Sequence, residues 1–119
     1  LYYIGVRCIE SGVPGDVDQW DPYCRKYEYS LDESLGALID YLKDNSLNEL
    51  QLGTRIIIVP GYEFKVVDVL VTNFHQPQST LLLLISAFVK GDWHKIYDFA
   101  LANDFRFLSY GDSSLLFKE

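Results

Sequence analysis

With 119 residues, of which 49% are hydrophobic and 15% aromatic, the chain can bury the core of one folded domain, so disorder is excluded for most of it. The formal net charge is −7, and residues 1–51 carry ten acids against four bases. This acidic balance argues against the chain supplying the main phosphate-binding surface of a nucleic-acid protein, and its ordinary effect is solubility.

The cysteine count and the apolar runs predict a cytoplasmic protein without a membrane segment. The chain has two cysteines, Cys8 and Cys24, whereas a secreted domain held by disulfides usually has more. No signal peptide is visible. The longest apolar run, residues 81–89, is too short to span a bilayer. The chain contains no methionine, with which a complete translation product begins, so we expect residue 1 to be a cut end.

The first half is predicted to hold two helices joined by a long loop. Residues 1–9 are largely apolar and have no cap before them, as the end of a helix would. Residues 11–30 contain glycines and prolines without a steady period, which is typical of a loop. A second helix is predicted to begin at Ser30 or Asp32, either of which can cap it, and to end near Asn45. Its apolar face is formed, at helical spacing, by Leu35, Leu38, Ile39 and Leu42.

Strands are expected next, because β-branched residues become frequent. The run at residues 55–59, closed by a Pro-Gly pair, predicts a buried strand, and residues 64–71 predict another. Residues 106–110 and 113–117 are predicted to be two further strands, joined by a hairpin at Gly111-Asp112.

Two helices are expected between these strand pairs. Residues 81–89 predict a buried helix that Ser79 or Thr80 can cap, and residues 92–103 predict a second helix with Asp92 as its N-cap. The mixture of strands and helices favours a layered α/β or α+β domain, and we treat residues 1–119 as one domain.

His75 and Asp68 are the first candidates for chemistry. Histidine exchanges a proton readily near neutral pH, but a lone histidine at a strand end is most often a structural hydrogen bonder. With His94 far along the chain and no cysteine at ligand spacing, the sequence shows no metal site. Asp68 lies inside an apolar strand, where a buried carboxylate would need a partner; the alternative is an exposed position on an edge strand.

A second polar segment, Ser109-Tyr110-Gly111-Asp112, combines a hydroxyl, a phenol and a carboxylate around a glycine. Its composition alone indicates an ordinary hairpin, and Pro60-Gly61-Tyr62 likewise indicates a common turn. From the residues alone, the chain is an acidic, mixed domain whose main polar segment of interest is residues 72–80, between two apolar runs.

Three stretches, however, occur in order: "PGYEFKVVD", "LVTNFHQPQSTLLLLISAF" and "IYDFALANDFRFLSYGDSSLLF". Together they resemble the S-adenosylmethionine:tRNA ribosyltransferase-isomerase family of queuosine biosynthesis, from about Thr54 to Phe117. Residues 11–50 match less well and resemble a lineage-specific loop plus helix, in a Bacteroidetes-like version of the family.

The resemblance implies a two-domain enzyme with a Rossmann-like α/β/α layered domain and a β-barrel domain. This chain would be the C-terminal part of the layered domain, without the barrel, and as a fragment it would be inactive alone, either a monomer or a dimer. The enzyme would transfer and isomerise the ribosyl group of S-adenosylmethionine onto 7-aminomethyl-7-deazaguanine in tRNA, giving epoxyqueuosine. Its partners would be tRNA and S-adenosylmethionine, the latter as a substrate, with no bound cofactor.

The resemblance also implies a set of site residues. His75 would be an acid/base or orienting group, and Asp112 would face the sulfonium or the aminomethyl cation. The substrate-binding set would comprise Tyr62, Asp68, Thr72, Asn73, Phe74, Ser109, Tyr110 and Gly111. The alternative of another class is a non-catalytic structural or partner-binding module with the same kind of fold.

Overall fold

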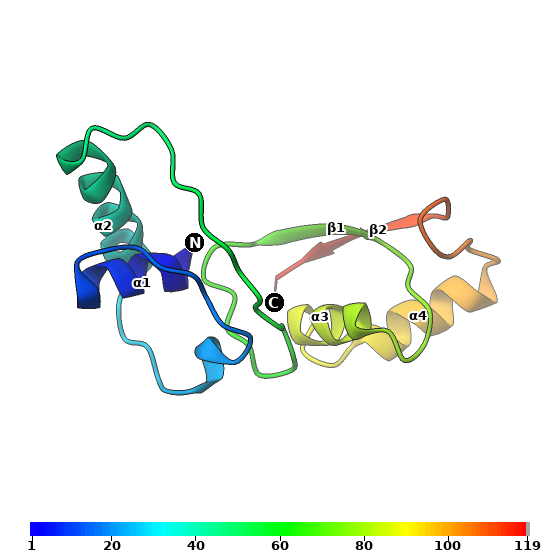
Figure 1. Ribbon diagram of the computed structural model, residues 1–119. Coiled ribbons are helices and arrows are strands. Elements are labelled where there is room, and N and C mark those ends of the chain that lie inside the picture. Colours follow the sequence, from blue (N-terminus) through cyan, green and yellow to red (C-terminus); the bar gives the residue numbers. More distant parts are fainter. Residues whose placement is uncertain (119) are drawn as a thin grey trace. The chain divides into compact units, whose positions relative to one another are not determined.

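A computed structural model describes residues 1–118, which fall into two compact units (Figure 1). The first, Leu1–Ile57, holds helix α1 (Tyr2–Ser11), the short 3₁₀ helix η1 (Asp21–Tyr23) and helix α2 (Leu31–Asp44). The second begins at Ile58 and holds, in chain order, β1 (Val69–Asn73), α3 (Thr80–Phe88), α4 (Trp93–Ala102) and β2 (Ser113–Phe117). The predicted mixed α/β class is confirmed. Within residues 1–118, no helix has the length and apolar character needed to cross a membrane.

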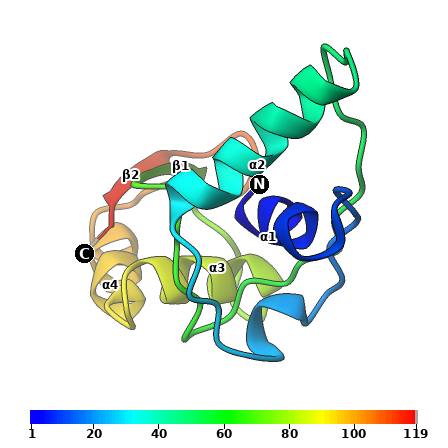
Figure 2. The same ribbon diagram turned by 90° about the vertical axis from the view of Figure 1, so that its left-hand side faces the viewer.

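In the first unit, α1 and α2 cross at a glycine (Figure 2). Ser34 is fully buried there, and its hydroxyl donates to the carbonyl oxygen of Tyr2 over 2.6 Å. A Cβ atom on Gly5 would lie 2.0 Å from Ser34 Oγ and 2.3 Å from its carbonyl oxygen. The two helices can therefore approach this closely only because residue 5 has no side chain.

The start of α2 confirms the predicted cap. Ser30 Oγ accepts from the backbone N–H of Glu33 over 3.0 Å, and the Glu33 carboxylate accepts from the Ser30 N–H over 2.6 Å. This reciprocal pair satisfies two donors that a helix start would otherwise leave exposed.

The predicted strand at residues 55–59 is wrong. The segment is irregular, with a single parallel bridge between Val17 and Thr54. Arg55 N–H donates to Val17 over 2.9 Å and Ile57 N–H donates to Gln19 over 3.2 Å, but the ladder goes no further. A β-branched run favours extended backbone, yet a strand also needs a partner of matching length, and here the partner segment is too short.

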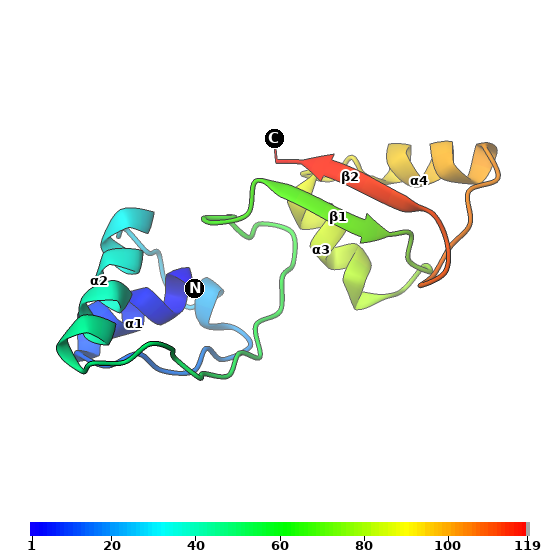
Figure 3. The ribbon, with the colours of Figure 1, turned by 90° about the horizontal axis from the view of Figure 1, so that it is seen from above.

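The second unit is built on an antiparallel pair. β1 and β2 align Val69 with Phe117 and Asn73 with Ser113, and α3 and α4 lie on one side of them (Figures 1 and 3). The predicted strand at residues 64–71 therefore begins later, at Val69, and runs on to Asn73. The side chains of Val71 and Leu115, which are paired across the ladder, remain exposed.

The predicted hairpin around Gly111-Asp112 is also wrong. Residues 106–110 form no strand, and β2 pairs instead with β1, far back in the chain. The reason is local: Leu108 has a left-handed φ of 70°, and the Asp112 carboxylate accepts from the Arg106 N–H over 2.7 Å. These contacts fold residues 106–112 into a closed loop.

Both predicted helices of the second unit are confirmed, and their faces make its core. Ser79 Oγ accepts from the N–H of Leu81 over 3.2 Å, as a cap should. Asp92 does hold the N-cap position of α4, but its carboxylate makes no cap hydrogen bond and pairs with Lys95 instead. The buried cluster comprises Phe74, Leu82, Ile85, Phe88, Val89, Tyr97, Ala100 and Leu116.

Candidate functional site

The structure joins the two polar segments that the sequence singled out. Directly after β1, Phe74 N–H donates to the carbonyl oxygen of Asp112 over 3.4 Å. Leu108 N–H donates to the carbonyl oxygen of Phe74 over 2.8 Å. Residues 72–75 and 106–112, which we call the β1-end site, thus meet through their backbones although more than thirty positions separate them in the sequence.

His75 is held at this site from two sides. Its Nε2 atom lies 2.9 Å from Thr72 Oγ1, and its backbone N–H donates to the Tyr97 hydroxyl over 2.9 Å. Thr72 Oγ1 also lies within 3.4 Å of the Asn73 carbonyl oxygen. No hydrogen bond to any other of residues 1–118 uses the second ring nitrogen, Nδ1. The ring is therefore oriented through Nε2, and the His75 side chain as a whole is half-buried.

Tyr97 supports this candidate site and was not among the residues predicted from the sequence. It lies on α4, is buried, and supports the His75 backbone through its hydroxyl. Burial raises the pKa of Tyr97, and the hydrogen bond from the His75 N–H acts in the opposite direction. Its spacing from Trp93 and Ala100 on this helix is typical of a core position and does not indicate a functional role. The available signal was that a buried tyrosine hydroxyl needs a hydrogen-bond partner.

Asp112 closes the loop of residues 106–112, which meets the Phe74 backbone. Oδ2 accepts from the Arg106 N–H over 2.7 Å, while Oδ1 lies 3.6 Å from the Arg106 guanidinium, and the Asp112 side chain is 40% exposed. A Cβ atom on Gly111 would lie only 2.4 Å from the Arg106 carbonyl oxygen, so this tight loop requires glycine at that position. The carboxylate therefore has a structural role, while its side chain remains partly exposed.

The other members of the predicted set differ in exposure. Phe74 is 3% exposed and contacts the rings of Tyr97, Phe105 and Phe107 at centroid distances of 5.4, 5.6 and 5.5 Å, so it anchors the site from the core. Tyr110 is 98% exposed, and Ser109 is exposed as well. Asn73 is half-buried at the end of β1, opposite Ser113.

Asp68 and Tyr62 lie elsewhere. Asp68 precedes β1, so the whole strand separates it from Asn73, a span of about 17 Å at the usual rise per residue. Its exposed carboxylate pairs with Lys118 at 3.0 Å, and of the two interpretations left open by the sequence, the exposed position holds. Tyr62 packs on Phe64, with centroids 4.9 Å apart, beside the same lysine. The structure does not bring these two residues to the β1-end site.

Within residues 1–118, no three histidine, cysteine, aspartate or glutamate side chains are placed to hold a metal ion. Both cysteines are free thiols, with Cys8 buried and Cys24 exposed. What the β1-end site offers is an imidazole, a carboxylate, hydroxyls, a carboxamide and an exposed phenol. Such groups can move protons, bind a cation and stack on a base.

The chain is similar to curated proteins named S-adenosylmethionine:tRNA ribosyltransferase-isomerase. The one from Rhizobium meliloti is 49% identical over 78 residues, which are 65% of this chain and 22% of that protein. The one from Chloroherpeton thalassium is 59% identical over 61 residues, which are 50% of this chain and 18% of that protein. The chain thus spans about a fifth of the length of these relatives.

A solved structure is similar as well. The S-adenosylmethionine tRNA ribosyltransferase of Thermotoga maritima matches with a TM-score of 0.51 and 29% sequence identity, over 71% of this chain and 38% of that one. The sequence model of the family described as "Queuosine biosynthesis protein" matches residues 24–116, which include both segments of the β1-end site. This match covers more than half of the chain's residues, and the chain therefore belongs to the queuosine biosynthesis protein family.

Proposed function

We propose that this chain is part of a tRNA ribosyltransferase-isomerase and that its β1-end site contacts the substrates. The whole enzyme would join the ribosyl group of S-adenosylmethionine, after rearrangement, to 7-aminomethyl-7-deazaguanine in tRNA, giving epoxyqueuosine. It would act in the cytoplasm and use S-adenosylmethionine as a substrate. The observation that carries the proposal is the junction of Phe74 with Leu108 and Asp112, which unites two segments inside the family match.

The first chemical demand is proton removal. A sulfonium acidifies the ribose carbon beside it, so a base placed near that carbon assists the reaction. His75 fits this role in the tautomer in which Nε2–H donates to Thr72 Oγ1, because Nδ1 then carries the free lone pair. A histidine positioned by a second group is the usual arrangement of a general base.

The second demand is to bind a cationic group of the substrates and to hold the tRNA base after it has left its stacked position. The Asp112 side chain is 40% exposed, and its Oδ1 lies 3.6 Å from the Arg106 guanidinium, so the carboxylate can also face the sulfonium or the aminomethyl cation. The exposed Tyr110 ring, with Asn73 at the strand end, can stack on and hydrogen-bond to a flipped base. Phe74 contributes by fixing the backbone between them.

The test compares variants of the intact enzyme. Epoxyqueuosine formation in tRNA and adenine release are measured for His75→Ala and Asp112→Asn, with His94→Ala as the matched control. His94 is exposed, and its ring stacks on Trp93 at 3.6 Å, so its loss should change turnover less than twofold. Loss of an acid/base group should lower turnover by about 10²–10⁴-fold.

Unchanged turnover in His75→Ala would remove that residue from the proposed role. If Asp112→Asn were equally active, the β1-end site would be structural, and the chain would be better described as a non-catalytic module of the enzyme. A melting curve of each variant separates lost chemistry from lost folding, because Asp112 also closes the 106–112 loop.

A further inference from the structure

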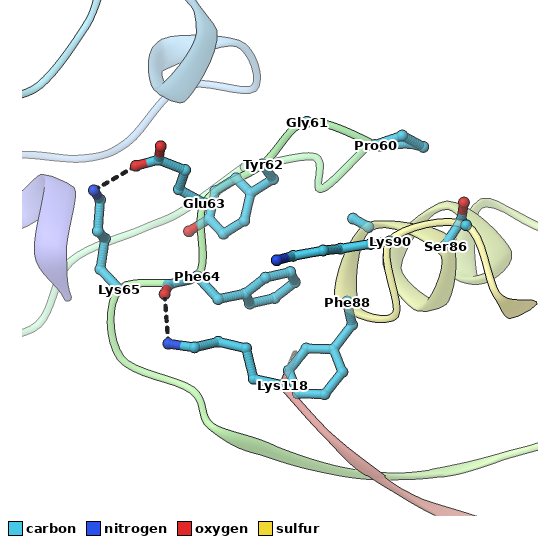
Figure 4. A pocket seen from close by; sticks show the side chains of 12 residues that line it. Pro60, Gly61, Tyr62, Glu63, Phe64, Lys65, Ser86, Phe88, Lys90 and Lys118 are labelled. Carbon is cyan, nitrogen blue, oxygen red and sulfur yellow. Dashed lines mark hydrogen bonds and ion pairs between the residues drawn. The ribbon is translucent and has the colours of Figure 1, made fainter.

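A second site lies in the same unit at the other end of β1. A cavity of about 700 Å³ opens between the turn at residues 60–65, the end of α3 and Lys118 (Figure 4). Its size falls within the range of about 300–1,000 Å³ that is usual for small-molecule sites. We call it the lysine pocket.

One part of its lining is aromatic and rigid. The Tyr62 and Phe64 rings meet edge to face at 4.9 Å, and Phe64 meets Phe88 in the same way at 5.0 Å. Phe88 is 1% exposed, so this series of rings is anchored in the core of the unit. A flat apolar ring of a ligand would find complementary surfaces here.

The rest of the lining is basic. In a chain of net charge −7 with ten basic residues, Lys65, Lys90 and Lys118 all line this pocket, against one acid, Glu63. Lys65 pairs with that glutamate at 2.5 Å. The Lys118 ammonium donates to the Phe64 carbonyl oxygen over 3.2 Å and pairs with Asp68 outside the pocket lining. The excess of positive charge favours an anionic ligand.

Lys90 is the cation available to that ligand. No ion pair or hydrogen bond within residues 1–118 uses its ammonium group, and Figure 4 shows its side chain extending across the pocket toward Tyr62 and Phe64. Its left-handed φ of 50°, followed by Gly91 at 94°, turns the chain sharply at the end of α3. A cation near a helix C-terminus can simply serve the helix dipole, but that role does not require an aromatic pocket around it.

We propose that the lysine pocket binds a phosphate-bearing nucleoside unit, with its base against Tyr62 and Phe64 and its phosphate at Lys90. The aromatic surface and the lysines match the two halves of such a ligand. The cationic sulfonium of S-adenosylmethionine is disfavoured here by the same lysines. That the unit belongs to the RNA substrate rests on the proposed function; a free nucleotide offers the same chemistry.

The test uses the intact enzyme with two probes, adenosine 5′-monophosphate and a single-stranded RNA oligonucleotide, whose affinities are measured over a series of salt concentrations. Lys90→Gln removes the charge, and Lys95→Gln, an exposed lysine on α4 outside the pocket, is the control. Lys90→Gln should weaken binding of at least one probe about 5–30-fold and lower the salt slope by about one, whereas Lys95→Gln should change affinity less than twofold.

The two probes distinguish the sources of the ligand. A Lys90-dependent affinity for the monophosphate assigns a free nucleotide, and dependence seen only with RNA assigns a unit within the polymer. Equal affinities of wild type and Lys90→Gln for both probes would overturn the proposal. The proposed function fails separately, because it would show as unchanged epoxyqueuosine formation in His75→Ala and Asp112→Asn whatever Lys90 does.

Discussion

Gly111→Ala should destabilise the loop that carries Asp112. The added Cβ atom would lie 2.4 Å from the Arg106 carbonyl oxygen and 2.6 Å from that of Phe107, and backbone atoms cannot rotate away as a side chain can. The loop must therefore open. Two hydrogen bonds would be lost, the 2.7 Å bond from the Arg106 N–H to the Asp112 carboxylate and the 2.9 Å bond from the Gly111 N–H to the Leu108 carbonyl oxygen.

The magnitude follows from these two bonds. A charge-assisted hydrogen bond contributes about 1.5–3 kcal/mol and a neutral one about 0.5–1.5 kcal/mol, so their joint loss costs about 2–4.5 kcal/mol. The alanine side chain offsets about 0.4–1 kcal/mol of this loss, because it lowers the conformational entropy of the unfolded chain. The free energy of unfolding should therefore fall by about 1–4 kcal/mol.

Urea unfolding, followed by circular dichroism, measures this change. Tyr110→Ala is the control, because its 98% exposed side chain lies next to Gly111 and should change stability by less than about 0.5 kcal/mol. If Tyr110 stacks on the substrate base as proposed, the same control should lose substrate affinity while it keeps its stability. An equally stable Gly111→Ala protein would show that the 106–112 loop is not closed as described.

Three further contacts are tested by substitution, two of them with a paired control variant. Tyr97→Phe should cost about 1–2 kcal/mol by leaving the His75 N–H without its partner. Burial raises the pKa of Tyr97, so its neutral phenol stabilises the folded protein fully below about pH 10, and this stabilisation is lost as pH rises through the folded-state pKa. The free energy of unfolding of Tyr97→Phe, measured in urea, should therefore fall less steeply at alkaline pH. Gly5→Ala should lower the melting temperature, whereas Gly36→Ala, with nothing within 4 Å, should raise it by improving helix propensity. Ser30→Ala should cost about 1 kcal/mol in urea unfolding, and Ser30→Thr should recover most of it.

The helices could be predicted because their signals are local. Ser30 caps α2 and Ser79 caps α3, each within three positions of its partner, and the apolar spacing of α4 is complete in ten residues. The strand predictions were wrong where the pairing partner is distant in the sequence. β2 pairs with β1, about forty residues earlier, rather than with the adjacent apolar run at 106–110. Nothing in that run marks the left-handed backbone of Leu108, since non-glycine residues seldom adopt it.

The β1-end site shows the same division. His75 and Asp112 could be identified as candidates from their residue types and from the family resemblance, but no spacing in the sequence relates either of them to Tyr97. The support of His75 by a helix 22 positions later, and the junction of Phe74 with Asp112, are tertiary contacts. Residue type therefore identifies what a site can do, whereas the positioning groups become visible only in the fold.

β1 places the two proposed sites at a defined separation. The β1-end site follows Asn73, and the lysine pocket is joined to the strand's start through Lys118 and Asp68. A strand of this length spans about 17 Å. A single bound nucleotide cannot bridge that span, but a polymer can engage both ends at once, and each contact then raises the effective concentration of the polymer at the other site.

If both proposals hold, Lys90→Gln should raise the KM for tRNA while leaving kcat unchanged, because the pocket would hold the polymer away from the reacting atoms. A fall in kcat with an unchanged KM would instead place Lys90 in the chemical step and refute this division of roles.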